Sequence, residues 1–358
     1  MSQRRSFIKQ ITLGSAALAL PNILVPRKKE RLGVALVGLG YYSTDLLAPA
    51  LQLTQHCALR GIVTGSPDKA ARWQKQYGIP EKNIYDYQNF DRIADNPDID
   101  VVYIVLPPVL HREFTARAAR AGKHVWCEKP MALTAAECKD MIGVCRDNRV
   151  RLAIGYRMQH EPITREIIGY GREKTFGQIK LISVADGYFD GRTDHWKQKR
   201  RMGGGAMFDM GVYALNAARY VTGEEPFAVT AQERTTRPEI YSEADETTLF
   251  QLEFSSGALA NCATSLGMNM NYLHVTAEKG AYQLEPFQSY SGIRGTTSRG
   301  KVLDQSVPNQ QARQMDDDAL AILNDTPMLV PGEEGWRDIR VVEAIQRSAA
   351  EGRRVRID

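Results

Sequence analysis

The chain has 358 residues, with 46 basic and 42 acidic side chains and a hydrophobic fraction of 43%. At about 150 residues per domain this length suggests two domains, and the composition is that of a globular protein, not of a disordered or fibrous one. The near balance of charge argues against nucleic acid or an anionic membrane surface as a partner. The five cysteines form no CxxC pair, so the sequence predicts buried thiols and gives no sign of a zinc site or a disulfide framework.

Residues 1–20 have the pattern of an export signal. Arg4 and Arg5 precede Phe7 and Lys9, and the weakly apolar run that follows is too short to span a bilayer. The paired arginines resemble a twin-arginine signal, which serves the export of folded proteins. We therefore expect a periplasmic protein, delivered by the twin-arginine route, with no membrane contact in its mature form. The alternative is a basic N-terminus of a cytosolic protein.

The first half of the chain, residues 31–155, is expected to be a dinucleotide-binding Rossmann domain. The apolar run 32–38 is typical of a parallel strand buried on both faces, and a helical pattern follows it through residue 51. The turn between them reads Gly38-Leu39-Gly40-Tyr41-Tyr42-Ser43, in which Gly38 permits the bend and Gly40 lets a pyrophosphate approach the backbone. Further strands are expected at 58–63, 101–106 and 124–127, with helices at 111–121 and 134–148.

The end of the second strand bears on the choice of cofactor. NAD-selective domains usually place an acidic residue there, on the ribose hydroxyls. This chain instead has Thr64, Gly65 and Ser66, with Lys69 close behind, and these groups can bind a 2′-phosphate. The sequence therefore favours NADP, while Asp68 leaves NAD as an alternative. Pro107 and His111 follow the next strand at the carboxyl edge of the sheet and are also cofactor-binding candidates.

Two later motifs carry candidate chemistry. Glu128-Lys129-Pro130 stands at another strand end, where charged residues are seldom a packing choice. Downstream, Gly203-Gly204-Gly205 precedes Asp209, Tyr213 and Asn216, which are spaced four and three apart and would share one face of a helix.

These motifs resemble the Gfo/Idh/MocA oxidoreductase family, and most closely its glucose-fructose oxidoreductase branch, which has Tyr where most of the family has His at position 213. The similarity extends along nearly all of the mature length. It includes residues 84–91, 122–125, 127–132, 154–157, 218–220, 222–226 and 331–335.

The resemblance implies an α/β Rossmann N-terminal domain plus an α+β C-terminal domain with a large open, mainly antiparallel sheet. Residues 156–330 would form the substrate and oligomerisation domain, giving a homodimer or homotetramer. Residues 331–358 would add a helix that packs back on the first domain. Alternating stretches at 180–185, 228–235, 247–254 and 258–265 predict strands of the second sheet.

The resemblance also implies an NADP-dependent enzyme that transfers hydride between the C1 atom of an aldose and nicotinamide, and that recycles a bound cofactor by reducing a second sugar. We expect Tyr213 to be the acid/base, Lys129 to lower its pKa, and Asp209 to orient a sugar hydroxyl. Glu128, Lys129, Arg157 and Trp196 join the cofactor-binding candidates.

Two departures from the branch keep alternatives open. Only about a dozen residues separate the signal from the first strand, where the branch has a longer proline-rich arm, and the segment 186–202 differs in length and composition. A conventional NAD(P)-dependent aldose dehydrogenase that releases its cofactor is therefore an alternative. A catalytically silent sugar- or nucleotide-binding protein is a further one.

Overall fold

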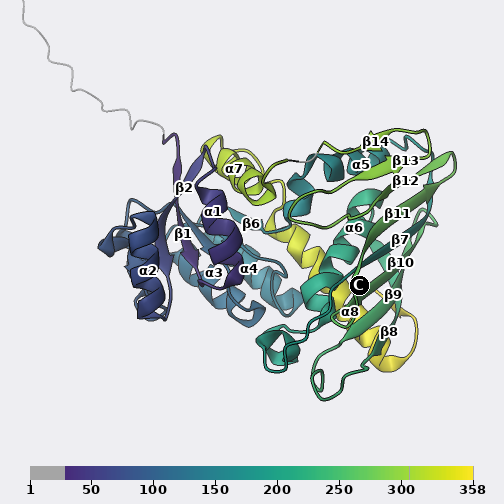
Figure 1. The fold of residues 1–358 in the computed structure, drawn as a ribbon, viewed down its shortest axis with the longest axis horizontal. Coiled ribbons are helices and arrows are strands. Elements are labelled where there is room, and N and C mark those ends of the chain that lie inside the picture. The colour runs from purple at the N-terminus through teal and green to yellow at the C-terminus, as the bar shows by residue number, and fades with distance from the viewer. Residues whose placement is uncertain (1–28, 306, 358) are drawn as a thin grey trace, which may run out of the picture.

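The computed structural model describes residues 29–305 and 307–357. The predicted export signal, residues 1–20, lies outside the described residues. Two sheets dominate the structure, one in each half of the molecule, with helices packed against both (Figure 1). Within residues 29–305 and 307–357, no helix combines the length and apolarity needed to cross a membrane.

The first sheet has six parallel strands in the order β3-β2-β1-β4-β5-β6. Their bounds are Leu32–Val37 (β1), Cys57–Val63 (β2), Ile84–Tyr85 (β3), Val101–Ile104 (β4), His124–Cys127 (β5) and Leu152–Ile154 (β6). Every residue of β1 is buried, as its continuous apolar sequence requires. The strand order reverses direction between β1 and β4, so the turn after β1 lies at the point where such sheets bind dinucleotides.

Helices cover both faces of this sheet. They are Ala48–Leu51 (α1), Pro67–Tyr77 (α2), His111–Arg120 (α3) and Ala135–Asp147 (α4), with a π-helical turn Tyr42–Leu47 (η1) before α1 and short 3-10 turns at Glu81–Asn83 (η2), Phe90–Asp95 (η3) and Pro108–Leu110 (η4). The apolar sides of α1 and α2 pack on one face, and those of α3 and α4 on the other.

The second sheet has nine strands in the order β14-β13-β12-β11-β7-β10-β9-β8-β15. The β7–β10 pair is parallel and the other pairs are antiparallel. The bounds are Ile179–Gly187 (β7), Pro226–Arg234 (β8), Thr247–Phe254 (β9), Leu259–Ser265 (β10), Met270–Ala277 (β11), Gly280–Leu284 (β12), Gly295–Thr297 (β13), Val302–Leu303 (β14) and Val355–Arg356 (β15). The predicted fold class, a Rossmann domain followed by a domain with a mainly antiparallel sheet, is confirmed.

The remaining helices line the inner side of the second sheet or join the two halves. They are Arg157–His160 (η5), Pro162–Arg172 (α5), Trp196–Gln198 (η6), Arg200–Met202 (η7), the π-helical Met207–Gly211 (η8), Val212–Thr222 (α6), Gln310–Leu323 (α7) and Gly332–Glu351 (α8). The first-half strands and helices lie within about two residues of the predicted ranges, apart from the interrupted helix of residues 42–51. The five cysteines are buried free thiols, as predicted.

The last two helices return to the first domain. Helix α7 packs its apolar side, including Met315 and Ala319, against the face of the first sheet that carries α1. Helix α8 lies between the two sheets (Figure 1). Ile154 of β6 donates a 2.9 Å hydrogen bond to the carbonyl of Val330, just before α8, and the backbone of Ala231 in β8 donates one of 2.9 Å to the Ser348 hydroxyl near its end. The C-terminal segment therefore ties both sheets together.

Candidate active site

The glycine turn after β1 has the geometry of a dinucleotide site. Gly38 has a φ of +90°, and a Cβ there would lie 2.5 Å from the carbonyl oxygen of Val105 after β4, so only glycine fits. A Cβ at Gly40 would meet no atom within 4 Å, which leaves open space beside the exposed backbone. Ser43, at the third fingerprint position, is buried and donates a 2.6 Å hydrogen bond to the Gly38 carbonyl, so its hydroxyl stabilises the turn.

The predicted 2′-phosphate residues lie beside this turn. Ser66 caps α2 by accepting a hydrogen bond from the backbone of Lys69, and the Thr64 hydroxyl accepts one from the backbone of Ser66. The Lys69 ammonium crosses back to the glycine turn and donates a 2.9 Å hydrogen bond to the carbonyl of Leu39. Gly65 is exposed next to the Tyr87 ring. Hydroxyls and one cation thus gather at the end of β2 with no acidic side chain at the strand tip, which suits a 2′-phosphate.

His111 is buried behind the site and supports two of its turns. The side chain is fully buried, with Nε2 2.8 Å from the Leu106 carbonyl and Nδ1 3.0 Å from that of Pro130. Both ring nitrogens therefore face protein carbonyls, of which the neutral ring donates to one, and His111 packs between the turn that contains Pro107 and the Glu128-Lys129-Pro130 turn. It was expected to bind cofactor directly. The structure instead gives it a positioning role.

Lys129 joins the two domains at the centre of the site. Its ammonium donates a 2.5 Å hydrogen bond to the backbone carbonyl of Asp209, lies 3.9 Å from Oδ1 of the same residue and sits 4.4 Å from the centre of the Tyr213 ring. The side chains of Lys129 and Asp209 are each only 11% exposed. Burial lowers the pKa of the Lys129 ammonium, and Asp209 opposes that shift. The three predicted catalytic residues therefore lie together.

Asp209 has a second cationic partner that the sequence analysis did not assign. The Lys197 ammonium lies 2.7 Å from Oδ2 of Asp209, and the Tyr188 hydroxyl donates a 2.9 Å hydrogen bond to the same oxygen. Burial alone would raise the pKa of Asp209, but Lys197 and Lys129 outweigh it and lower the pKa to about 2. Asp209 is therefore an ionised hydrogen-bond acceptor at neutral pH.

The expected depression of the Tyr213 pKa is wrong. Burial raises the pKa of the Tyr213 phenol to about 12. Among the groups that oppose this shift Arg157 contributes most, and a side-chain hydrogen bond with Gln288 adds to it, whereas Glu128 and Asp186 raise the pKa further. The Lys129 ammonium lies over the face of the ring, and 92% of the Tyr213 surface is removed from water. Desolvation therefore dominates, and Tyr213 is a protonated donor at neutral pH.

Glu128 is held in a closed slot. The Tyr103 hydroxyl donates a 2.7 Å hydrogen bond to Oε1, and the backbone of Lys129 donates one of 3.3 Å to Oε2. A Cβ at Gly155 would lie 2.6 Å from Oε1, so that residue leaves the space the carboxyl occupies. Gln314 of α7 reaches the Tyr103 hydroxyl at 3.4 Å. Burial raises the pKa of Glu128, while Tyr103 and Lys129 oppose the shift.

Arg157 and Trp196 each lie near a member of this centre or its partner. Arg157 is 1% exposed, and its guanidinium carbon is 5.6 Å from the centre of the Tyr213 ring. Trp196 begins the short helical turn that also carries Lys197, whose ammonium is 6.0 Å from the indole. Both candidates are therefore close to the Lys129–Asp209–Tyr213 group.

Close packing explains why the residues at 204 and 205 in the triple-glycine motif are glycines. A Cβ at Gly204 would lie 2.4 Å from the Lys197 carbonyl, and one at Gly205, where φ is +112°, would lie 2.0 Å from Oδ1 of Asp245. The carboxylate of Asp245 in turn accepts a 2.7 Å hydrogen bond from the backbone of Met207. The glycines let the Lys197 loop approach the start of the Asp209 helix, which sets the distance between those two side chains.

Asn216 lies three residues after Tyr213 on the regular helix α6, but its side chain is used in a different group of residues. Its amide donates hydrogen bonds of 2.9 Å to Asp338 and 3.1 Å to Glu334, both on α8. Asp209 itself lies in the wider π-helical turn η8, which changes the angle between Asp209 and the residues of α6. Asn216 instead belongs to a buried ion-pair group centred on Arg219.

Several site residues were not found from the sequence. Asp186 of β7 is 1% exposed, and burial raises its pKa well above the usual value, against the influence of Lys129 and Arg157. An acidic residue within the apolar strand Val184-Ala185-Asp186 was the signal that could have identified it. Gln288 and Tyr290 lie on a loop with no distinctive motif, and only the fold brings them to Tyr213 and Arg157.

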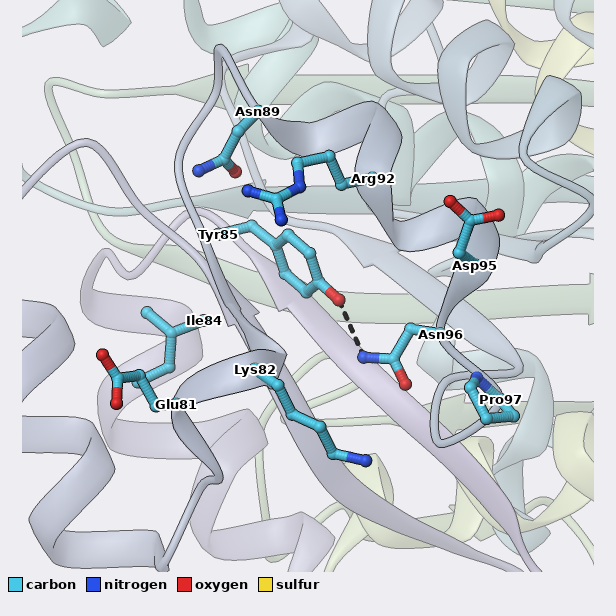
Figure 2. Close-up of a pocket in the computed structure, with 9 residues that line it drawn as sticks. All are labelled: Glu81, Lys82, Ile84, Tyr85, Asn89, Arg92, Asp95, Asn96 and Pro97. Atoms are coloured by element: carbon cyan, nitrogen blue, oxygen red, sulfur yellow. Dashed lines mark hydrogen bonds between the residues drawn. The ribbon is translucent and has the colours of Figure 1, made fainter.

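A polar pocket of about 730 Å³ lies elsewhere in the first domain, between β3 and the segment that leads to β4 (Figure 2). Within it the Tyr85 hydroxyl accepts a 2.7 Å hydrogen bond from the Asn96 amide. None of the candidate site residues lines this pocket. The candidate active site is therefore defined by the glycine turn, the Glu128-Lys129-Pro130 turn and the Asp209 helix, and this pocket is separate from it.

Comparisons with known proteins identify the family. Residues 32–156 match the model of the oxidoreductase family with an NAD-binding Rossmann fold, and residues 165–283 match the GFO/IDH/MocA C-terminal domain. The chain belongs to the Gfo/Idh/MocA oxidoreductase family. Like the other members, it therefore joins a nicotinamide-nucleotide-binding domain to a second domain that completes the site.

Individual relatives cover nearly the whole chain. An aldose-aldose oxidoreductase from Caulobacter crescentus, solved with glycerol, is 42% identical with a TM-score of 0.88, over 91% of this chain and 99% of that one. A D-xylose 1-dehydrogenase (NADP(+)) from Haloarcula marismortui is 28% identical over 340 residues, which cover 90% of this chain and 92% of the relative. The scyllo-inositol dehydrogenase of Lactobacillus casei, 18% identical with a TM-score of 0.77 over 92% and 99% of the two chains, shares the fold.

Proposed function

We propose that this Gfo/Idh/MocA protein is an NADP-dependent sugar oxidoreductase that oxidises one aldose at C1 and reduces a second sugar with the same bound cofactor. The observation that carries the proposal is the contact of Lys129 with both Asp209 and Tyr213, close to the Glu128 slot at the carboxyl edge of the nucleotide-binding sheet. The similarity to the aldose-aldose oxidoreductase and to the NADP-dependent xylose dehydrogenase supports sugar as the substrate class.

The residues present fit a nicotinamide dinucleotide. The open space at Gly40, the hydroxyls and Lys69 at the end of β2, and the buried Arg157 without a hydrogen-bond partner at Nε together provide a cradle for an anionic, planar ligand. Gly38, Gly40, Thr64, Ser66 and Lys69 would hold the phosphates and ribose. When bound, the cofactor accepts a hydride from the sugar C1 or returns it.

The chain's own residues handle the proton and the charge. In sugar reduction the hydride adds to the carbonyl carbon, and the Tyr213 hydroxyl supplies the proton to the oxygen because it is protonated at neutral pH. The Lys129 ammonium stabilises the negative charge that develops on that oxygen. Asp209, which is ionised, accepts a hydrogen bond from a neighbouring sugar hydroxyl.

Oxidation runs through the same groups in reverse. The C1–H bond breaks with transfer of the hydride, and the C1 hydroxyl proton must pass to a base. Burial lowers the pKa of Lys129 and raises that of Tyr213. The Lys129 ammonium therefore loses its proton more readily than a lysine in water does, and the Tyr213 phenol holds its proton more tightly than a tyrosine in water does. We therefore assign the proton to the Lys129–Tyr213 couple as a unit: before oxidation the lysine nitrogen and the phenol oxygen share one proton, and after it has taken the C1 hydroxyl proton the couple holds two, as it does at the start of reduction.

The test uses the purified protein without added cofactor. Incubation with ¹³C-labelled glucose and unlabelled fructose should release gluconolactone and sorbitol in equal amounts, and label in the sorbitol would mean that an aldose is the acceptor. Nucleotide released by denaturation should be stoichiometric NADP. The Tyr213→Phe variant should form less gluconolactone and less sorbitol, both lowered by the same factor. Turnover only with added NADP or NAD would instead establish the conventional dehydrogenase, and no turnover with intact nucleotide binding would favour the silent binding protein.

We further propose that the protein is periplasmic and exported through the twin-arginine route, on the basis of Arg4 and Arg5 and the apolar run after them. Periplasmic nicotinamide nucleotide is not replenished from a free pool, so recycling in place suits this location. Expression of the full chain in strains with and without the twin-arginine machinery, followed by fractionation, tests the assignment. Equal periplasmic recovery from both strains would refute it.

We also propose a homodimer or homotetramer. The outer face of the second sheet carries the half-exposed apolar side chains Leu181, Leu249 and Leu259, which a second copy could cover. Light scattering of the purified protein measures the mass directly, and a monomer at micromolar concentration would refute the proposal.

A further inference from the structure

The loop between β12 and β13, residues 285–294, extends from the second domain to the cofactor turn. Its start is fixed in place. The Phe287 side chain is 1% exposed, and the backbone N–H groups of Phe287 and Gln288 donate hydrogen bonds of 2.9 and 3.0 Å to Oδ1 of Asn271. The Asn271 amide also donates to the Gln288 carbonyl. Asn271 pairs with Asp186 across β11 and β7, so the loop is anchored at the strand end that faces the site.

The anchored loop places Tyr290 against residues of both domains. Its ring centre lies 4.8 Å from the guanidinium carbon of Arg157 and 6.1 Å from the ring centre of Tyr42. Tyr42 follows the glycine turn directly, and Arg157 begins the segment after β6. The Arg157 guanidinium also faces the Tyr213 ring at 5.6 Å, so it lies between two tyrosines. The Tyr290 ring of the second domain thus contacts Tyr42 at the cofactor turn and also Arg157, which faces the catalytic Tyr213.

Arg157 has an unusual environment that points to a ligand. It is 1% exposed, and its close contacts are the Tyr213 and Tyr290 rings and the Met158 sulfur, 3.0 Å from Nη1. Glu128 and Asp186 interact with its charge, but within residues 29–305 and 307–357 neither carboxylate lies in ion-pair distance. Its Nε has no hydrogen-bond partner. A buried guanidinium normally pairs with an acid. The Nε–H donor is therefore available to a polar or anionic group bound between the glycine turn and Tyr213.

From these contacts we infer that Tyr290 and Arg157 form a clasp that closes over the bound nicotinamide cofactor and sets how fast it leaves. This inference rests on the proposed function only in taking NADP as the ligand. Tyr290 is 41% exposed and its covered part contacts Arg157 and Tyr42, so it stands at the edge of the site. A residue at that place can move aside without disturbing the core. It therefore suits control of release and not a part in proton transfer.

The clasp explains how retention could be achieved without a long N-terminal arm. The ring contributes a cation–π contact with Arg157, and it adds a contact between the two domains that must break before the cofactor site opens. Because Tyr290 contacts Arg157 and Tyr42, removal of its ring should act on the rate at which the cofactor leaves.

The experiment measures NADPH release. Protein loaded with NADPH is mixed with excess NADP in a stopped-flow instrument, and the fluorescence of the bound reduced cofactor is followed. Tyr290→Ala should release NADPH about tenfold faster than the wild type, since one cation–π contact corresponds to about that factor. Tyr290→Phe keeps the ring and should release at the wild-type rate.

Phe189→Ala is the matched control, because Phe189 is also an exposed aromatic ring with an arginine over it, Arg237 at 4.6 Å. It should leave release unchanged. Wild-type release from Tyr290→Ala, or equal acceleration by Phe189→Ala, would overturn the clasp. The readout requires no sugar turnover, so a protein that binds NADPH but fails the glucose and fructose test would refute the proposed activity while still deciding the role of Tyr290.

Discussion

The ammonium of Lys197 lies 2.7 Å from Oδ2 of Asp209, which joins a loop of the second domain to the helix that carries Tyr213. The pair is mostly enclosed, with side-chain exposures of 23% and 11%. Asp209 touches Lys129 on its other side. The carboxylate is thus fixed between two cations, and its orientation depends on a residue from the segment in which this chain differs most from the branch it resembles.

Replacement of Lys197 by Met should therefore misplace Asp209. We expect kcat/KM for glucose to fall by about 100-fold, the size of effect that a misplacement of about 1 Å can produce. Lys199→Met is the control, because Lys199 pairs with the exposed Asp194 in the same loop. Steady-state kinetics of the two variants check the prediction, and a Lys197→Met enzyme as active as the control would contradict it.

The low pKa of Asp209 should appear in acid stability. A carboxyl whose pKa is about 2 in the folded state, against about 3.9 when unfolded, stabilises the fold at every pH above 4 and loses that contribution as the pH falls toward 2. The difference corresponds to on the order of 2 kcal/mol. Urea titrations at pH 6 and pH 3 should show wild type losing more stability than Asp209→Asn, and an equal loss would show that the Asp209 pKa is not depressed.

The close packing around Glu128 predicts that one methyl group added at Gly155 lowers activity and cofactor affinity strongly. In Gly155→Ala the new Cβ would lie 2.6 Å from Oε1, so the carboxyl must leave its hydrogen bond with Tyr103. We expect kcat and NADP affinity to fall by about tenfold or more, in line with about 1 to 3 kcal/mol for overpacking.

Gly169→Ala is the control for that variant, because Gly169 lies within α5 and its added Cβ would meet nothing within 4 Å. It should keep full activity and gain about 0.5 to 1 kcal/mol of stability, since Ala is the better helix former. Fluorescence titration with NADPH and kinetics distinguish the two. Normal NADPH affinity and kcat in Gly155→Ala would refute the importance of the slot.

The choice between NADP and NAD should depend on Lys69. Its ammonium is the cation that reaches the glycine turn from α2, and a hydrogen bond to a charged group contributes about 1.5 to 3 kcal/mol. Lys69→Ala should lower the ratio of NADP to NAD affinity by at least about tenfold. Lys75→Ala, in the last turn of the same helix, should leave the ratio unchanged. An unchanged ratio in Lys69→Ala would move 2′-phosphate recognition to other residues.

The sequence predicted the fold because its signals are local. The β5 and β9 boundaries are reproduced to the residue, since the apolar run of β5 ends at Glu128 and the alternating pattern of β9 ends at the Ser255-Ser256-Gly257 turn. The meeting of Lys129 with Asp209 and Tyr213 followed from motif resemblance. Residues such as Tyr103, Gln288 and Tyr290 could not be found, because they reach the site only through the tertiary packing of β4 and of the loop after β12.

The electrostatics of the site were the least predictable part. The sequence places a lysine near Tyr213 but does not show how completely the phenol is removed from water, and burial determines the direction of its pKa. The four-and-three spacing likewise does not show that α8 packs against α6, where Asp338 takes up the Asn216 amide. Both corrections arise from packing that separate segments create together.

The return of α7 to the first sheet has a consequence for biosynthesis. The face of that sheet beneath Met315 and Ala319 is apolar, and residues near 310–323 leave the ribosome only when most of the chain has been made. A nascent chain that has completed only residues 31–155 would expose this surface to water. The first domain should therefore mature late, after synthesis, so a ribosome-bound N-terminal half should be sensitive to protease and a client for holdase chaperones until α7 has docked.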